Sequence, residues 1–347
     1  MSEPGEQSGG GDLAAPGELE RGEVLSDELR EALDDLRGEI RSRFPAREAP
    51  RIEKIDWIAL AQAFQRRLTT LMMSERSGEV DEFGMDEIVL RRARPLLELL
   101  YGVYWRVDLG GIERIPDAGP CLLVANASGL LPYDALMVSH AISRERADVR
   151  PRFMVADWLI TLPFVQPYLA RLGGVRACRE NAERLLRSGQ TVLVFPEGQK
   201  GAAKVFRERY RLKRFGRGGV VRVALETRVP IVPIGIVGAE EAHPILFKWT
   251  APGRAVGLPF LPVTPTFPLF GPLGLLPLPT KWLIRIGEPI PVDHLAPDAA
   301  LDELLISRMN EELRSRIQLL VDAGLADRSS VWEGRTESAR AVPLSAE

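Results

Sequence analysis

Residues 121–145 read CLLVANASGLLPYDALMVSHAISRE, and this stretch indicates the fold. It opens with an uninterrupted apolar run of strand length, passes through a loop of small residues, and continues with helical periodicity from Asp134. A strand without polar alternation is typical of a sheet that is covered on both faces. The stretch therefore predicts one strand, one loop and one helix of an α/β domain.

The same alternation continues on both sides of this stretch. Short apolar runs predict further strands, and segments with helical periodicity separate them. The strands are expected within residues 105–116, 150–157, 191–198, 229–240 and 281–290, and the helices within residues 158–174, 181–190 and 216–227. Functional sites in such sheets collect where strands end and loops turn toward helices. The loops at 125–134, 195–201 and 237–241 are therefore the candidates for chemistry.

Composition divides the chain into four predicted parts. Residues 1–25 form an acidic arm rich in Gly and Pro that is expected to be disordered, and they lack the basic and apolar segments of a secretory signal. Residues 26–104 carry helical periodicity, most clearly at 26–43, 52–73 and 81–104. Residues 105–325 hold the α/β domain, and residues 326–347 are expected to form a flexible tail.

The near-neutral charge of the 347-residue chain hides two opposite blocks. The formal net charge is −3, yet residues 1–50 hold 6 basic and 13 acidic residues, and residues 171–222 hold 14 basic and 4 acidic ones. The basic block is either a solvated face or a surface that binds phosphate groups or anionic lipid. The apolar loop near the C-terminus, described next, favours lipid over nucleic acid as its partner.

Residues 258–282 are strongly apolar but contain seven prolines, which exclude a regular helix and a core strand. Such a segment can lie in a bilayer interface, or it can pack under the helices of its own domain. The chain contains no uninterrupted run of about 20 apolar residues, so the sequence predicts no transmembrane helix.

Cysteine and histidine are scarce. Cys121 and Cys178 form neither a disulfide framework nor a zinc-site spacing, which suggests a reducing compartment. The three histidines are His140, His243 and His294. The sequence also lacks the glycine-rich dinucleotide and P-loop fingerprints and the G-x-S-x-G elbow of serine hydrolases.

Four ordered blocks resemble the PlsC-like glycerolipid and lysophospholipid acyltransferase superfamily, and within it the diacylglycerol-acyltransferase-like bacterial branch. They are NASGLLPYD at 126–134, GGVRACREN at 173–181, FPEG at 195–198 and VPIVPIGIVGAEE at 229–241, and the resemblance spans about residues 105–291. It implies a mixed, mostly parallel central sheet covered by helices, with N-terminal helices, as in glycerol-3-phosphate acyltransferases.

The resemblance also implies roles for individual residues. Ala127 occupies the position of the family's general-base histidine, and Asp134 matches the aspartate that orients it. The residues that match substrate-binding positions are Ser128, Gly129, Arg179, Phe195, Pro196, Glu197, Gly198 and Lys200. The acyl donor would be acyl-CoA or acyl-carrier protein, the acceptor a hydroxyl of a lysophospholipid or other glycerolipid, and no metal or redox cofactor is expected. We expect Ala127, Asp134, Arg179 and Glu197 to line one cleft.

Alanine cannot accept a proton, so Ala127 is a departure from the family at its most important position. The chain is a His-to-Ala variant of an active enzyme, a family member that lost catalysis and retained lipid binding, or one that uses another base. The other blocks match the family, which favours the first interpretation. His140 is expected to be a helix-surface or packing residue, not a replacement base, and nothing in the sequence assigns His243 to the cleft.

Two functions follow from this sequence. The first is an acyltransferase that works while bound peripherally to the anionic inner face of the cytoplasmic membrane, inactive as written because of Ala127. The alternative is a catalytically dead lipid-binding protein of the same fold. Neither interpretation includes a nucleic-acid partner.

Overall fold

The computed structural model describes residues 80–332, except 130, 161–165, 256–257 and 297. The chain divides into two units, residues 1–60 and 61–347, and all described residues belong to the second. The predictions for the acidic arm at 1–25, for the helices at 26–43 and 52–73, and for residues 333–347 lie outside the described residues.

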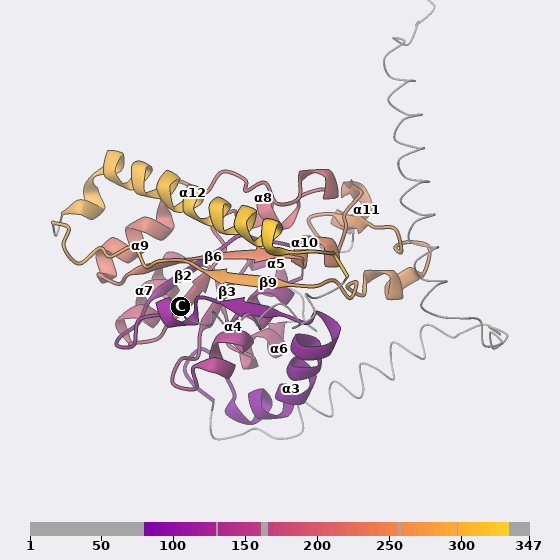
Figure 1. The fold of residues 1–347 in the computed structure, drawn as a ribbon, viewed down its shortest axis with the longest axis horizontal. Coiled ribbons are helices and arrows are strands. Elements are labelled where there is room, and N and C mark those ends of the chain that lie inside the picture. Colours follow the sequence, from indigo (N-terminus) through magenta and orange to yellow (C-terminus); the bar gives the residue numbers. More distant parts are fainter. Residues whose placement is uncertain (1–79, 130, 161–165, 256–257, 297, 333–347) are drawn as a thin grey trace, which may run out of the picture. The chain divides into compact units, whose positions relative to one another are not determined.

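A seven-stranded sheet forms the centre of the described unit (Figure 1). Its strand order is β1-β9-β6-β2-β5-β3-β4, and every neighbouring pair in it is parallel except β6 and β9. The expected mixed, mostly parallel sheet is therefore confirmed. The strands are β1 (Asp108–Gly110), β2 (Leu122–Ala125), β3 (Arg152–Val155), β4 (Gly174–Arg176), β5 (Val192–Val194), β6 (Ile231–Val237) and β9 (Leu283–Ile286).

Helices lie before, between and after the strands, and they include those expected within residues 134–145, 158–174, 181–190 and 216–227. They are α3 (Glu87–Leu99), the π-helical turn η1 (Leu100–Tyr104), α4 (Tyr133–Glu145), α5 (Asp157–Ile160), α6 (Gln166–Arg171), α7 (Arg179–Arg187), α8 (Gly198–Ala202), α9 (Gly219–Thr227), α10 (Ala239–Ala242), α11 (Thr250–Ala255) and α12 (Glu303–Asp327). Shorter 3₁₀ turns lie at Ile112–Arg114, Phe206–Glu208, Gly271–Leu275 and Ala299–Leu301. No described helix combines the length and the apolar character that crossing a membrane requires.

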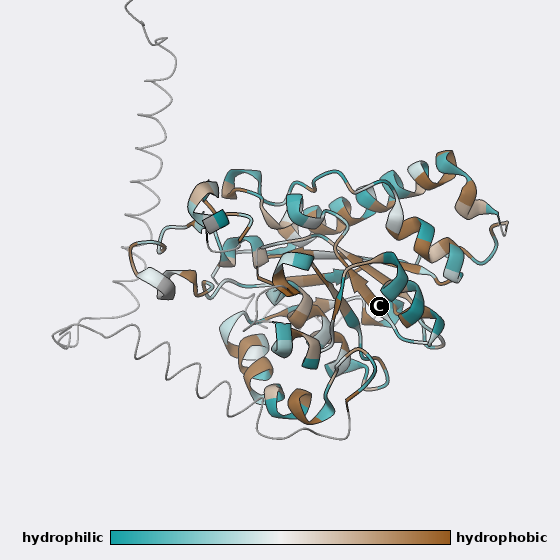
Figure 2. Ribbon diagram, turned by 180° about the vertical axis from the view of Figure 1, so that it is seen from behind, coloured by the Kyte–Doolittle hydropathy of each residue, from teal (hydrophilic) through white to brown (hydrophobic). Residues whose placement is uncertain are grey.

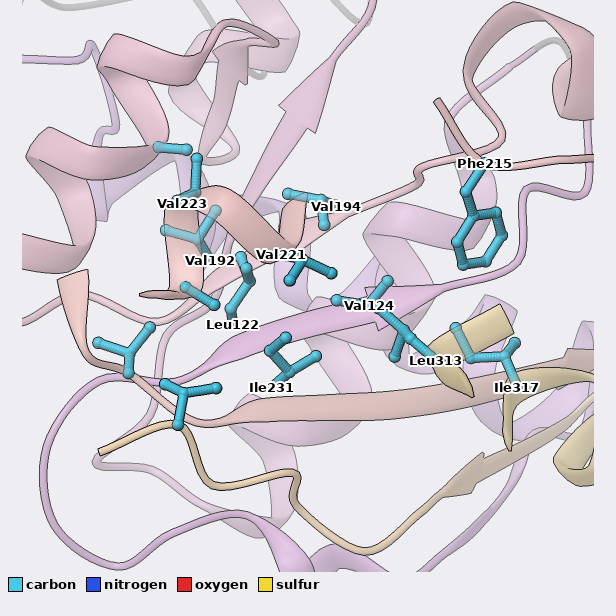
Figure 3. Close-up of a cluster of buried hydrophobic side chains, with 14 of the residues drawn as sticks. Leu122, Val124, Val192, Val194, Phe215, Val221, Val223, Ile231, Leu313 and Ile317 are labelled. Atoms are coloured by element: carbon cyan, nitrogen blue, oxygen red, sulfur yellow. The ribbon is translucent and has the colours of Figure 1, made fainter. Parts of the chain in front are cut away.

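Apolar side chains that alternate along the strands build a separate core on each face of the sheet. Leu122 and Val124 of β2 point toward α7, α9 and α12, whereas Leu123 and Ala125 point toward α4. Figure 3 shows the first of these cores, and Figure 1 shows α12 on one side of the sheet and α3, α4 and α6 on the other. The strands are predominantly hydrophobic in Figure 2, which agrees with burial on both faces.

Helix α12 is not among the elements expected from the sequence. Its N-terminus is capped by Asp302, whose side chain accepts hydrogen bonds from the backbone N–H groups of Leu304 and Leu305 at 2.9 and 3.0 Å. The helix buries one stripe, including Leu313, Ile317 and Val321, against the sheet. It therefore completes one of the two cores.

The prolines of residues 258–282 are accommodated outside the main sheet. Strand β8 (Leu261–Val263) pairs with β7 (Phe247–Trp249) in a separate two-stranded antiparallel sheet, where Pro262 has no central-strand position to disrupt. Trp282, at the end of the segment, is buried and stacks on Trp105 with ring centroids 4.5 Å apart. The segment thus has a packed end and, as shown below, an exposed middle.

The region at 173–181 differs from the sequence expectation. The glycines of this block suggest a turn between elements, but the block contains the edge strand β4 and the first turn of α7. A Cβ atom at Gly174 would lie 2.9 Å from the ring of Phe153 and 2.8 Å from the carbonyl oxygen of Leu169. The glycine therefore serves the close approach of β4 to its neighbours.

Asn126 joins the end of β2 to β6. Its amide nitrogen donates to the Ile236 carbonyl oxygen at 3.0 Å, and its amide oxygen accepts from the Ile236 N–H at 2.7 Å. The side chain is fully buried, so both groups need these partners. This pair of hydrogen bonds fixes the point from which the loop at 126–134 leaves the sheet.

We expect Gly235→Ala to lower the free energy of unfolding by about 1–3 kcal/mol. A Cβ atom there would lie 2.7 Å from the Cβ of Leu320 and 2.9 Å from the backbone of α12, so the helix would have to shift away from β6. The matched control is Gly102→Ala, where the new methyl group meets no atom within 4 Å. Urea unfolding of both variants tests this, and equal losses would contradict the assigned contact.

Candidate active site

The parallel strands bring three of the four sequence blocks to one edge of the sheet. β2, β5, β3 and β4 are neighbours, and the residues that follow their carboxyl ends are Asn126, Phe195, Ala156 and Ala177. A cavity of about 620 Å³ opens among these loops. Of the predicted site residues, those that line it are Ala127, Gly129, Asp134, Arg179, Phe195, Pro196 and Gly198.

Most of the cavity wall is apolar. It runs along the sheet face that α7 and α9 cover, where Leu122, Val194 and Val223 contribute both to the wall and to the core seen in Figure 3. The wall also includes residues 216–219 at the start of α9, together with Arg222 and Asn310. The space can therefore hold an apolar chain with a polar group near Ala127.

Asp134 lies next to the Ala127 position. Its Oδ2 accepts hydrogen bonds from the backbone N–H of Ser128 at 3.1 Å and from the Ser128 hydroxyl at 2.8 Å, and its Oδ1 accepts from the N–H of Ala135 at 2.8 Å. Burial raises the pKa of Asp134, and these hydrogen bonds oppose that rise. The carboxylate is thus held against the loop that carries Ala127.

Ser128 supports the aspartate and does not line the large cavity. Its side chain is buried, and it borders a much smaller space that it shares with Lys204, Glu240 and His243. Its proposed substrate contact stays a prediction, whereas its hydrogen bond to Asp134 is present in the structure.

Glu197 of the FPEG block is directed into the protein interior. Its Oε1 accepts a hydrogen bond from the Ala127 N–H at 2.9 Å, and its Oε2 accepts from the Lys213 N–H at 2.6 Å. The Lys204 ammonium group lies 3.3 Å from Oε2, and the exposed side-chain fractions of Lys204 and Glu197 are 3% and 0%. The carboxylate therefore positions the loop at Ala127. The expectation that Glu197 lines one cleft with Asp134 and Arg179 is wrong, because its side chain is buried outside the cavity wall.

Lys204 continues this buried network to the fourth block. Its ammonium group donates to Glu240 of α10 at 2.7 Å, and Glu240 also accepts from the Tyr210 N–H at 2.9 Å. Burial raises the pKa of Glu240, and Lys204 opposes the rise. Neither interpretation of the basic block, a solvated face or a surface that binds anions, holds for Lys204, because it is buried between two carboxylates.

Arg179 lines the cavity from the first turn of α7 but is already paired. Its Nε donates to Glu183 at 2.6 Å, and its guanidinium group also contacts Glu226 of α9. Lys200, also predicted to bind substrate, is exposed on α8 and is not part of the cavity wall.

The histidines occupy positions away from the large cavity. His140 packs edge-on against Tyr101 with ring centroids 5.7 Å apart and lies 3.5 Å from Glu98, which confirms it as a packing residue. His243 stacks on Tyr133, and its Nε2 and the Leu275 carbonyl oxygen are 2.6 Å apart. His294 is exposed. In the described ranges, no three His, Cys, Asp or Glu side chains cluster in a way that could hold a metal ion.

Several residues of this region were not predicted as site residues. Glu240 and Tyr210 anchor the loops, and Cys178 and residues 216–219 line the cavity. Glu240 lay within a recognised block, but nothing in its local sequence indicates that its carboxylate is buried. Tyr210 adopts a positive φ of 63°, which no sequence pattern signals.

We expect Lys204→Met to lower the free energy of unfolding by about 3–5 kcal/mol, because it leaves two buried carboxylates without their cation. Lys213→Met is the matched control. That ammonium group is only partly buried beside Glu208, so its loss should cost less than about 1 kcal/mol.

The free energy of unfolding of Lys204→Met should also depend on pH. Without Lys204, the pKa of Glu240 rises further above its unfolded value, so the folded state holds the proton more tightly than the unfolded chain. Stability of Lys204→Met therefore falls as the pH rises above about 4.3. Chemical unfolding at acidic and neutral pH measures this, and a deficit that shrinks with rising pH would contradict the buried network.

The two thiols should react at different rates. Burial raises the pKa of Cys121 to about 11, so its thiol stays protonated near neutral pH, whereas Cys178 is half-buried and lines the cavity. We expect a maleimide to label one thiol in the folded chain and two after unfolding. Cys178→Ser should remove the fast reaction, and fast labelling of Cys121 would contradict its burial.

Known proteins resemble this chain over most of its length. The acyltransferase family model matches residues 106–237. An uncharacterized protein of Mycobacterium tuberculosis strain H37Rv is 39% identical over 324 residues, covering 93% of this chain and 89% of that protein. A Mycobacterium leprae protein is 42% identical over 289 residues, covering 83% and 77%.

Two further relatives are more distant. The human DGAT1/2-independent enzyme synthesizing storage lipids is 26% identical over 226 residues, covering 63% of this chain and 62% of that protein. The crystal structure of the 1-acyl-sn-glycerophosphate acyltransferase PlsC from Thermotoga maritima shares 19% identity and a TM-score of 0.43, covering 78% of this chain and 90% of that one. The family model and the close relatives show that the chain belongs to the PlsC-like acyltransferase family.

Proposed function

We propose that this protein is built to move a fatty acyl group from acyl-CoA or acyl-carrier protein to a hydroxyl of a lysophospholipid or other glycerolipid, and that Ala127 leaves the present chain without turnover. The observation that carries the proposal is the shared cavity, where Ala127 and Asp134 lie beside a largely apolar chamber. Such a chamber suits a fatty acyl chain.

The chemistry requires one base and one group that orients it. A histidine at position 127 would accept the proton of the acceptor hydroxyl, while the Asp134 carboxylate would orient the ring and stabilise its charged form. The acceptor oxygen would form a bond to the thioester carbonyl carbon, the carbon–sulfur bond would break, and the departing thiolate would take the proton. A thioester is already activated for this attack, so the proposed reaction needs no metal or redox cofactor.

The surroundings support a histidine at this position. Ala127 lines the cavity, so a larger side chain there has space in front of it, and its backbone N–H is fixed by Glu197. Gly201 faces the Ala127 Cβ without a side chain of its own, since a Cβ atom there would lie 2.9 Å from it. Because Ala127 belongs to the cavity wall, we expect an imidazole ring at this position to extend into the cavity.

The proposed place of work is the anionic inner face of the cytoplasmic membrane, to which the protein would bind peripherally. The supporting observation is that basic residues and exposed apolar residues occur on neighbouring segments of the described unit. A lipid-binding protein that lost catalysis is the second candidate, since the same apolar cavity could bind a lipid without transferring it.

We expect Ala127→His to produce acyl transfer that the starting chain lacks. The assay supplies purified protein with acyl-CoA or acyl-carrier protein and a panel of lysophospholipid and other glycerolipid acceptors, and mass spectrometry detects the product. Adding Asp134→Asn to Ala127→His should lower kcat by about 10²–10⁴.

The Cys178 thiol offers a control that does not depend on turnover. If the acceptor protects Cys178 from maleimide in both chains but Ala127→His transfers no acyl group, the lipid-binding candidate replaces the enzyme. If the starting chain turns over as fast as Ala127→His, another base operates and the assigned role of position 127 is wrong.

A further inference from the structure

The connection between α8 and α9, residues 203–218, carries a row of outward-facing cations that we call the basic strap. Tyr210, Leu212 and Phe215 point inward and are buried. The residues between and around them are exposed arginines: Arg207, Arg209, Arg211, Arg214 and Arg217. Tyr210 fixes the middle of the strap, since its N–H donates to Glu240 and its carbonyl oxygen accepts from Gln318 at 2.8 Å.

Most of the strap's charge is not compensated within the described unit. Arg209 lies 3.8 Å from Glu241, but Arg207, Arg211, Arg214 and Arg217 form no ion pair with a described residue. The arginines around α7 differ in this respect. Each of them pairs with a carboxylate: Arg176 with Asp157, Arg179 with Glu183 and Glu226, Arg184 with Glu82, and Arg187 with Glu183. Of these two clusters of arginines, the strap therefore leaves more positive charge available to a partner.

Large apolar side chains are exposed on the β7–β8 hairpin and on the loop that follows it. Phe247 and Trp249 alternate along β7, so they share one side of the hairpin, with exposed fractions of 61% and 49%. Leu269, Phe270 and Leu276 lie in the following loop, where Leu269 is 82% exposed. We call these five residues the apolar lip.

The strap and the lip are neighbours. The Phe206 N–H donates to the Ile245 carbonyl oxygen at 2.8 Å, two residues before Phe247. Lys213 of the strap and, more weakly, Lys248 of β7 both lower the pKa of Glu208. The loop carrying Leu269 is tied back to the hairpin, because both Thr264 and Thr266 hydroxyls donate to the Gly274 carbonyl oxygen. The strap also reaches the cavity, whose wall includes Gly216 and Arg217.

We propose that the basic strap and the apolar lip form one docking surface for an anionic bilayer. Phenylalanine, tryptophan and leucine side chains of the lip would enter the interface, and the unpaired arginines would meet lipid phosphates. A soluble acidic partner would match the strap but would leave the adjoining lip in water. This proposal rests on the lipid substrate proposed above. The docking surface would bring the opening of the cavity to the membrane that contains this substrate.

The test measures cosedimentation of the full chain with vesicles, which requires no turnover. We expect binding to phosphatidylglycerol–phosphatidylcholine vesicles that weakens as salt is added, and little binding to phosphatidylcholine alone. Arg207→Glu/Arg211→Glu should lower the affinity about tenfold or more. Arg184→Glu/Arg187→Glu, with the same change in net charge on α7, should lower it far less.

The lip is tested with a second matched pair. Leu269→Ser/Phe270→Ser should weaken vesicle binding, while Leu304→Ser/Leu319→Ser, which removes two exposed leucines from α12, should not. Bromine on the lipid acyl chains should quench the tryptophan fluorescence of the bound chain. Trp249→Phe should remove most of that quenching, because it removes the exposed indole of the lip.

Three results would overturn the docking surface. They are absence of binding to anionic vesicles at low salt, equal losses in the test and control pairs, and a dimer that Leu269→Ser/Phe270→Ser dissociates in sedimentation. Turnover of the Ala127→His chain with detergent-dispersed acceptor is measured separately. Turnover without vesicle binding would contradict the docking surface and support the proposed reaction. Vesicle binding without turnover would support the docking surface and contradict the proposed reaction.

Discussion

The buried carboxylate of Glu197 accepts backbone hydrogen bonds from Ala127 and Lys213 and lies beside the Lys204 ammonium group. Through these contacts it holds the loop after β2, the turn after β5 and the strap between α8 and α9 in one arrangement, and Lys204 extends the network to α10. A charge without solvent around it is tolerated only when such partners surround it. The walls of the cavity therefore depend on a group that does not itself line the cavity.

The fold was largely predictable because its strands are apolar runs of the right length between segments of helical period. The β2 stretch is buried on both faces, and that environment leaves a direct trace in its composition. The β7–β8 pair and α12 were missed for different reasons. The hairpin contains Pro262 and belongs to no core sheet, while the stripe of α12 is interrupted by exposed leucines such as Leu319.

The sequence predicted which loops form the site, but it did not predict what each side chain in those loops contacts. The order of parallel strands brings Ala127, Asp134 and Arg179 to one cavity, as the blocks implied. The direction of Glu197 and the burial of Lys204 could not be read from the chain, because a lysine in a basic run has the same local sequence whether it is exposed or paired. Only its tertiary neighbours, Glu197 and Glu240, distinguish the two cases.

The position of β9 has a consequence for how the chain is assembled during synthesis. This strand is the last of the sheet in sequence, yet it lies between β1, the first, and β6. The five neighbouring strands from β6 to β4 can pair once residue 237 has left the ribosome, and they include the strands that surround the cavity. β1 and the segment before it have no sheet partner until residues 283–286 follow. Nascent chains of intermediate length therefore carry most of the site on a sheet with an open edge. Both β9, which closes that edge, and α12, which completes one core, are synthesised later.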